Sequence, residues 1–434
     1  MDKIFSYLSQ NITFPSLNPD YTSYLYDGPV FTLQSLVVDI LSTINPVVVF
    51  VFFVVASLAY FVWIKIRYPF WNTQPVRHTY SWMPKVGVLN RVLPKTKFYD
   101  TTGRISTKVW SSVTNLEIEE MCRVLQSHWI LSDQLFCGIQ VPDLAAFGAS
   151  VVSVFREKVY TTDKGEEPDT KLFGLVLSRP GKLWVRGLSS LDKTVADILV
   201  QDYLVVLRGS SSDSTRRLFD THEYNCRLLK PDVQVSVFKK EVELLEGVVP
   251  LVEYTCYTFY LRNLKLRRLP RDFRIIRVQT QHTDILHDFL RSGLQMFDVA
   301  ITLDIGVLLA LLKTNQMYMY ALKRGDQVFG IYWFKNAHVK WDVDELGSTL
   351  HFVASFKNTE NADLFSLGFS HSLREVLREF REYRMLMMDG LGHNGEIVEL
   401  WRQTHDTIVK TQCAYYLYNW GLPGVSRERC LVIL

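Results

Sequence analysis

A run of small and basic residues offers the clearest chemistry by residue type and spacing. From Arg208 to Arg217 the chain reads RGSSSDSTRR, directly after an apolar strand and before a helical run. Small residues let successive backbone N–H groups converge, and a helix amino terminus adds a positive dipole end, so such a loop can bind a pyrophosphate. Arg216 and Arg217 would add charge. An ordinary polar loop with a Ser or Asp helix cap explains the same residues.

Searches for other catalytic motifs give little. The sequence has no G-x-x-x-x-G-K-[ST] phosphate loop, and we expect neither nucleotide hydrolysis nor Rossmann redox chemistry. His282 and His287 are five residues apart, a spacing that does not place them on one helix face, and no H-E-x-x-H occurs, so no metal is expected. Ser236 and the serines at 210–212 lack a G-x-S-x-G elbow, which argues against a hydrolase triad.

Alternating strand-like and helix-like stretches must position these residues, and they predict an α/β or α+β fold. The strand-like runs are rich in β-branched and aromatic residues, and the helical ones repeat apolar residues every three to four positions. The expected strands are 172–178, 182–187, 203–209, 233–238, 255–269 and 327–339, and the expected helices are 116–130, 362–383 and 395–403.

Composition indicates a largely globular protein. The chain has 434 residues, 48% of them hydrophobic, which is enough for two or three domains or one large duplicated domain. Because 48 Lys and Arg oppose 45 Asp and Glu, the net charge of +3 gives no support for a nucleic-acid partner. The six cysteines form no C-x-x-C pair, and we expect buried thiols rather than a disulfide framework.

One segment has the character of a membrane anchor. From Pro46 to Ile64 the chain has nineteen residues without a charge, close to the ~30 Å of a hydrocarbon core when helical. A buried core helix or a signal peptide are the alternatives. Lys65, Arg67 and further basic residues follow the segment, whereas residues 1–45 hold one basic side chain, Lys3. The positive-inside rule therefore predicts a transmembrane helix over 46–66, with residues 1–45 outside and the bulk of the chain cytosolic.

Two longer stretches resemble a known family. Tyr68–Val76 reads YPFWNTQPV, and Tyr415–Trp420 reads YYLYNW. Together they resemble glycylpeptide N-myristoyltransferase, whose catalytic domain opens with F-W-x-T-Q-P-V and closes with Y-Y-L-Y-N-W. Fainter matches lie between them in the same order, so the resemblance spans roughly residues 68–434.

The resemblance implies a fold of two similar halves, each like a GNAT acetyltransferase and related by a pseudo-two-fold axis. The first half, 67–253, would bind acyl-CoA, and the second, 254–434, would bind most of the acceptor peptide. The implied reaction moves a myristoyl-type acyl group from CoA to the amine of an amino-terminal glycine. Acyl-CoA is thus a co-substrate, and no resident cofactor is implied.

The resemblance also assigns roles to particular residues. Backbone N–H groups of Tyr203 and Leu204 would hold the thioester oxygen, because fixed donors stabilise charge without reorganising. A lid over the CoA and acyl chain is implied at Tyr68, Phe70 and Trp71. The residues implied to bind the CoA phosphates are Arg208, Gly209, Ser210, Ser211, Ser212, Arg216 and Arg217.

In the family the terminal carboxylate accepts a proton from the attacking amine, which here would be the carboxylate of Leu434. A carboxylate with a pKa near ~3.5 is a poor base for an amine near ~8 unless burial narrows the gap. The apolar run Cys430–Leu434 could thread this end into the core, or could simply finish a sheet.

Departures from the family motifs leave the activity open. Val235–Phe238 stands where the family has Y-T-A-G, and Met387–Asn394 stands where it has N-A-L-D-L-M-E-N. Ser236, Met387, Asn394 and Tyr416 are therefore weak candidates for substrate contact. The leading hypothesis is a membrane-tethered N-acyltransferase. The alternatives are an inactive acyl-binding or structural membrane protein, and an enzyme that transfers a short acyl group.

Overall fold

The computed structural model divides the chain into two compact units, Met1–Asn72 and Thr73–Leu434. Each unit is described by itself. The described residues are 46–67, 87–89, 91, 93, 103–127, 135–159, 169–186, 193–207, 212–241, 249–261, 266–341, 347–422 and 424–434.

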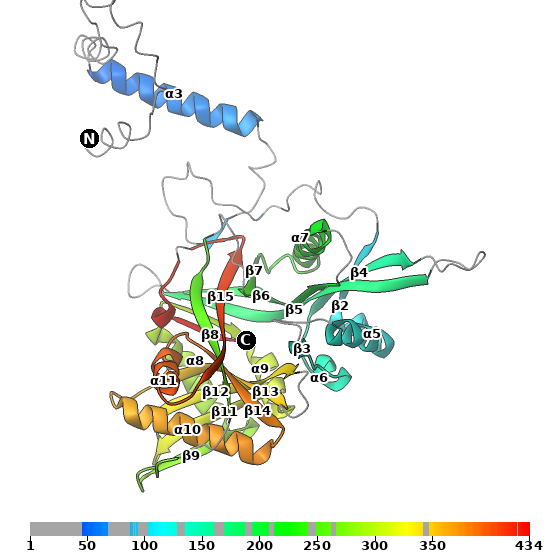
Figure 1. The fold of residues 1–434 in the computed structure, drawn as a ribbon. Coiled ribbons are helices and arrows are strands. Elements are labelled where there is room, and N and C mark those ends of the chain that lie inside the picture. The colour runs from blue at the N-terminus through cyan, green and yellow to red at the C-terminus, as the bar shows by residue number, and fades with distance from the viewer. Residues whose placement is uncertain are drawn as a thin grey trace, which may run out of the picture. The chain divides into compact units, whose positions relative to one another are not determined.

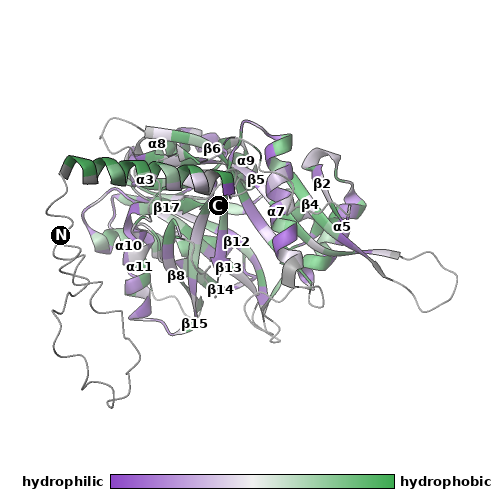
Figure 2. Ribbon diagram, turned by 90° about the horizontal axis from the view of Figure 1, so that it is seen from above, coloured by the Kyte–Doolittle hydropathy of each residue, from purple (hydrophilic) through white to green (hydrophobic). Residues whose placement is uncertain are grey.

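In the first unit the described residues form the helix α3 (Pro46–Arg67). Figure 2 shows apolar residues along most of its length, and its large apolar side chains, such as Phe50, Phe52 and Ile66, are exposed. Across the described part of the chain, no helix meets the combined length and hydropathy of a bilayer crossing. The transmembrane helix predicted over 46–66 is therefore not confirmed.

In the second unit, fifteen of the described strands form one mixed sheet (Figure 1), so the expected mixing of helices and strands is confirmed. Its main path is β17 (Cys430–Ile433), β10 (Val299–Leu303), β5 (Asp169–Arg186), β6 (Lys193–Val206), β7 (Val235–Glu241), β15 (Thr407–Tyr418), β8 (Val252–Tyr260), β14 (Tyr383–Asp389), β13 (Ser348–Lys357), β12 (Gln327–Trp341), β11 (Met317–Arg324) and β9 (Phe273–Val278). Joined to it are β2 (Ile105–Val109), β3 (Leu135–Cys137) and β4 (Val151–Val159), while β1 (Gly87–Val88) pairs with β16 (Trp420–Gly421).

Helices cover both faces of this sheet. α8 (Thr283–Ser292) and α9 (Ile305–Lys313) share one apolar core with β10 and β17, and α10 (Ala362–Glu379) and α11 (Asn394–Arg402) share another with β11–β14. α7 (Ser212–Leu229) packs on β4, β5 and β6, while α5 (Asn115–Gln126) and α6 (Val141–Ala145) build a third core with β3 and β5. The three predicted helices correspond to α5, α10 and α11.

Several strand predictions differ from the structure; the expected strand 203–209, for one, is the end of the longer β6. The expected strands 172–178 and 182–187 are one strand, β5, although Pro180 and Gly181 read as a turn. A Cβ at Gly181 would lie 2.7 Å from the backbone oxygen of Thr302, so the neighbouring strand β10 requires this glycine. The expected strand 255–269 was too long, because β8 ends at Tyr260 and residues 266–269 are not extended into the sheet.

The division into halves at residue 253 stays a prediction. That boundary falls inside β8, which pairs with β15 on one side and β14 on the other. The apolar chain end does form a strand, since β17 pairs in parallel with β10. All six cysteines are free and buried, as expected.

Candidate functional site

Two central strands part at the candidate site. β6 and β7 pair in parallel from Ile198↔Val235 to Gln201↔Phe238. Beyond that point β6 stays paired with β5 as far as Val206, and β7 stays paired with β15 as far as Glu241, but they no longer pair with each other. The next residues, Asp202 on β6 and Lys239 on β7, therefore stand where the sheet opens.

A β-bulge interrupts β6 at the same point. Asp202 pairs with Leu177 and Val205 with Leu175, so Tyr203 and Leu204 together stand opposite one residue, Val176. Tyr203 has a φ of +52°, which is uncommon for a residue with a side chain, and its ring packs 5.1 Å from that of Phe147. Since β7 has parted, it gives the described residues of the bulge no ladder partner on that side. Bulges are over-represented beside active sites, so this irregular stretch of β6 is a candidate functional position.

The carboxyl end of the chain is buried. Leu434 is 5% exposed, and the four residues before it form the buried strand β17. Figure 1 marks the chain end within the second unit rather than at its edge. Nζ of Lys335, on β12, donates a hydrogen bond to the backbone oxygen of Leu434 over 2.8 Å. The last residue therefore lies against the half-buried side chain of Lys335.

Electrostatic effects link this pair to the parted strands. Burial and the nearby Arg179 cation lower the pKa of Lys335 to about 8, with smaller effects from Asp202, Lys239 and Asp389. Arg179 Nε donates to Asp202 Oδ2 over 2.7 Å. Because Asp202 and Lys239 follow the last paired residues of β6 and β7, charges at the opening of the sheet act on Lys335.

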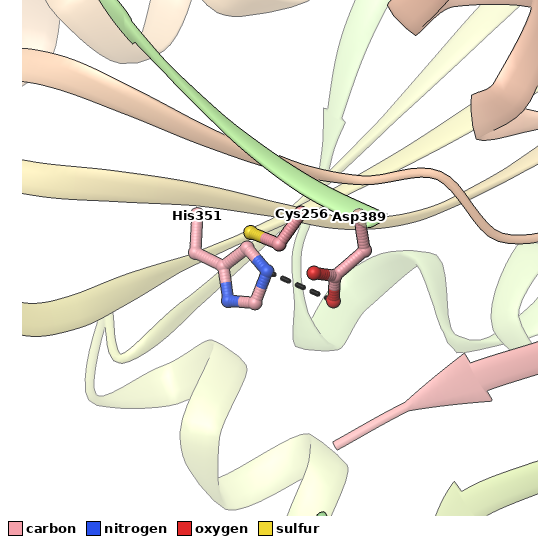
Figure 3. A group of neighbouring side chains, drawn as sticks. All are labelled: Cys256, His351 and Asp389. Atoms are coloured by element: carbon pink, nitrogen blue, oxygen red, sulfur yellow. Dashed lines mark ion pairs between the residues drawn. The ribbon is translucent and has the colours of Figure 1, made fainter. Parts of the chain in front are cut away.

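A second group of ionisable residues lies on β7, β13 and β14. Nζ of Lys239 and Oε1 of Glu241 are 2.6 Å apart, and Nε2 of His351 and Oδ2 of Asp389 are 3.0 Å apart. Figure 3 shows the ring of His351 directed toward Asp389, with the Cys256 thiol beside them. Burial lowers the pKa of His351. Burial alone would raise the pKa of Asp389, but His351 and Lys239 outweigh it and hold that pKa below its usual range.

Thiol, imidazole and carboxylate are groups that bind zinc, and in this cluster their ligand atoms lie within 4.8 Å of one another. His351 and Asp389 already contact each other, however, and Lys239 offsets the charge of Asp389. Since these contacts account for the cluster, we assign no metal to it.

A glycine motif that sequence reasoning missed lies after β14. Gly390–Gly395 reads GLGHNG, a G-x-G-x-x-G between a strand and α11, the order typical of dinucleotide-binding loops. Most of its amides, including those of all three glycines, already donate to backbone oxygens: Gly390 to Thr255, Gly392 to Arg427, Asn394 to Leu391 and Gly395 to Gly392. A loop whose N–H groups pair with its own protein cannot cradle a pyrophosphate, so the structure gives no support for Rossmann chemistry here.

The predicted site residues fall into three groups. Tyr68, Phe70 and Trp71 and residues 208–211 lie outside the described residues. Ser212 begins α7, and Arg216 and Arg217 are exposed in its first turns, Arg216 beside Asp220 at 3.7 Å. Tyr203 and Leu204 form the bulge at the opening, and Leu434 hydrogen-bonds to Lys335, on which the charges of the opening act.

The four weak substrate candidates are not gathered in one place. Ser236 lies beside Glu223 of α7, and Tyr416 stacks on Phe238, which also contacts α7. Strand alternation therefore puts both on the face opposite Lys239. Met387 pairs with His351 across β13 and β14. Asn394 is fully buried and donates from Nδ2 to the backbone oxygen of Val353, which is a structural contact.

The sequence analysis missed Arg179, Asp202, Lys239 and Lys335. One signal was present: Lys335 directly follows the apolar run Ile331–Phe334, so a strand buried on both faces carries a charge. Such a residue needs a partner inside the protein. Its partner could not be read from the sequence, because Leu434 is 99 residues away.

Comparison with known proteins supports the fold. No family model and no curated protein sequence matches the chain. Among solved structures, Saccharomyces cerevisiae N-myristoyltransferase with bound myristoyl-CoA matches with a TM-score of 0.59 at 10% identity, over 83% of this chain and 90% of that one. A second structure of the yeast enzyme, with myristoyl-CoA and inhibitors, matches with a TM-score of 0.59 at 11% identity, over 82% and 91%.

The second unit thus has an N-myristoyltransferase-like fold, in agreement with the resemblance of the sequence. At 10–11% identity the likeness shows the fold alone. A GCN5-related N-acetyltransferase from Anabaena variabilis matches with a TM-score of only 0.42, which is too low to carry an argument for GNAT-like halves.

Proposed function

We propose that this protein is an N-acyltransferase that moves a myristoyl-type acyl group from CoA to the amine of an amino-terminal glycine. The observation that carries this proposal is the opening between β6 and β7. The bulge at Tyr203 and Leu204 lies there, and its neighbouring charges act on Lys335, which hydrogen-bonds to the buried end at Leu434, within an N-myristoyltransferase-like fold.

In the proposed reaction the backbone N–H groups of Tyr203 and Leu204 hold the thioester oxygen. They are fixed by the bulge before the reaction, so they stabilise the developing negative charge without reorganising. The CoA phosphates would bind at the start of α7, where Arg216 and Arg217 supply positive charge near the positive end of an 18-residue helix. Lys335 and the carboxylate of Leu434 would together accept the proton that the acceptor amine must lose before it attacks.

Attachment of the chain to a lipid bilayer through α3 is also part of this proposal. Its exposed apolar side chains surround the helix, and a helix that is apolar all round is stable only where another apolar phase covers it. A single myristoyl chain binds membranes only marginally, at about 10⁴ M⁻¹, so acylation close to a bilayer would favour retention of the product. The predicted orientation, with residues 1–45 outside and the bulk cytosolic, stays a prediction.

The test is acyl transfer by the full-length protein. With alkyne-tagged myristoyl-CoA, a peptide that begins with glycine should gain one acyl group, detected by mass spectrometry, and free CoA should appear in equal amount. The matched control is the same peptide with an acetylated amino terminus, which has no free amine and should stay unlabelled.

An inactive acyl-binding protein is the second candidate. It is favoured by Ser236, which replaces the family's threonine and lies toward α7 instead of toward Lys239. Calorimetry with a non-hydrolysable myristoyl-CoA analogue separates the two functions. Binding without transfer to any glycine peptide would support the second candidate and refute the first.

A further inference from the structure

A pocket of about 360 Å³ lies in the second unit, between the end of β5, the helix α8 and the short turn η4 (Gly293–Met296). Trp184, which lines it, is seven residues beyond Leu177, the β5 partner of Asp202. At ~3.3 Å per residue, the pocket lies roughly 23 Å along β5 from the opening between β6 and β7. It is therefore separate from the proposed acyl-transfer site.

The walls of this pocket are largely apolar. Trp184 and Val185 of β5 form one side, and Leu290, Leu294 and Phe297 form the other. Leu294 and Phe297 are buried in the core that α8 shares with β10, so packing fixes this wall. The volume is at the small end of the ~300–1,000 Å³ typical of ligand pockets. These walls therefore suit a small ligand with an apolar body.

Two guanidinium groups line the same pocket, those of Arg186 on β5 and Arg291 on α8. Both side chains are exposed, and within the described part of the chain neither forms an ion pair. Arg429 and, to a smaller extent, Arg186 lower the pKa of Asp298, but both carboxylate oxygens of Asp298 are held by Arg429, at 2.8 and 3.0 Å. The pocket thus keeps two arginines whose paired N–H donors match a carboxylate.

We infer that this pocket binds a medium-chain fatty acid. Its carboxylate lies between Arg186 and Arg291, and its chain covers the apolar walls around Trp184. Inorganic phosphate would satisfy the two cations but leave these walls exposed to water, and the two long chains of a phospholipid exceed the volume. The inference goes beyond the proposed acyl transfer and does not rest on it, because the two sites use different ends of β5.

The experiment is photolabelling of the full-length protein with octanoate that carries a diazirine and an alkyne on its chain. A saturating non-hydrolysable myristoyl-CoA analogue keeps the proposed acyl-transfer site occupied. Mass spectrometry should find the label on peptides that contain residues 184–186 or 290–297. Unlabelled octanoate should compete. Octan-1-ol has the chain without the charge and acetate has the charge without the chain, so neither should compete at the same concentration.

Variants test the two parts of the pocket. Arg186→Gln and Arg291→Gln should each weaken the competition by octanoate roughly 10–100-fold, since each removes a hydrogen bond to a charged group. Gln295→Trp, at an exposed position that lines the pocket, should fill it and prevent labelling although both arginines remain. Arg381→Gln is the matched control, because Arg381 is exposed between α10 and β14, and it should behave as wild type.

Several outcomes would overturn the inference. These are label found only on other peptides, equal competition by octan-1-ol, and unchanged competition by octanoate in both arginine variants. Thermal melting of each variant shows whether a loss of labelling reflects a loss of structure. Acyl transfer is measured separately on the same preparations, so its absence would refute the proposed function and leave the fatty-acid pocket standing.

Discussion

Burial decides which side chains of this protein can change charge near neutral pH. Glu223 of α7 is 2% exposed, and its burial raises the pKa from 4.5 to about 7, although Ser236 and Arg227 act to lower it. His222, the preceding residue, lies between the hydroxyls of Ser153 and Ser178, and burial lowers its pKa to about 3. Both side chains are therefore neutral under acidic conditions in which His222 would be charged in an unfolded chain.

Glu223 makes stability depend on pH. Its pKa is higher in the folded than in the unfolded state, so its contribution is fully present below pH 4.5 and is lost as pH rises through about 7. Glu223→Gln stays neutral and should raise the free energy of unfolding by roughly 1–3 kcal/mol at pH 8, with little change at pH 5. Urea unfolding at the two pH values measures this. Glu399→Gln, on an exposed side chain, should behave as wild type at both. A constant difference between pH 5 and 8 would contradict the assignment.

The element that matters most for the proposed chemistry is the bulged strand β6. Sequence reasoning expected a strand at 203–209, and the structure has β6 from Lys193 to Val206, so the predicted start lies inside the real strand. The polar residues Gln201 and Asp202 hid the continuity, because they interrupt an apolar pattern. Gln201 and Asp202 interrupt the apolar pattern where β6 and β7 stop pairing. That position is the candidate site, and the proposed chemistry needs polar residues there.

Two variants at Leu204 test whether its backbone N–H group, rather than its side chain, stabilises the oxyanion. Leu204 is 38% exposed, so Leu204→Ala should keep transfer within about threefold of wild type. Proline has no N–H, and bulges are among the few strand positions that tolerate it. Leu204→Pro should therefore lose roughly 10²–10³-fold in kcat, as when one oxyanion donor is removed. Steady-state kinetics and thermal melting of both variants give the answer. If the two variants had equal activity and equal stability, the Leu204 amide would not be an oxyanion donor.

At the scale of the whole molecule, one continuous sheet connects the groups of the site. Lys335 on β12 and Asp202 on β6 are six strands apart along its main path, yet Asp202 contributes to the pKa of Lys335. The sheet must therefore curve so that the charges of β6 act on β12, and β17 inserts the chain end beside β10. The helix α3 belongs to the other compact unit. Its exposed apolar side chains are the basis of the proposed membrane attachment.

Membrane attachment through α3 is tested in the full-length protein. Replacement of Val51, Val54 and Val55 by lysine should move the protein from the pelleted membrane fraction to the supernatant, since each central charge costs about 2.5–3.5 kcal/mol in a bilayer. Replacement of the same three residues by leucine is the matched control and should leave it in the pellet. Wild-type protein that stays in the supernatant after vesicle sedimentation would refute the attachment.

The sequence by itself determined the α/β class, the helices α5, α10 and α11, the buried free cysteines and the likeness to N-myristoyltransferase. These depend on local periodicity and on two runs of consecutive residues, YPFWNTQPV and YYLYNW. Only the tertiary structure decided that Lys335 meets Leu434, that the G-x-G-x-x-G at Gly390–Gly395 has most of its amides occupied, and that Ser236 lies toward α7. Each of these depends on contacts between strands or loops distant in sequence, and no local pattern encodes such a contact.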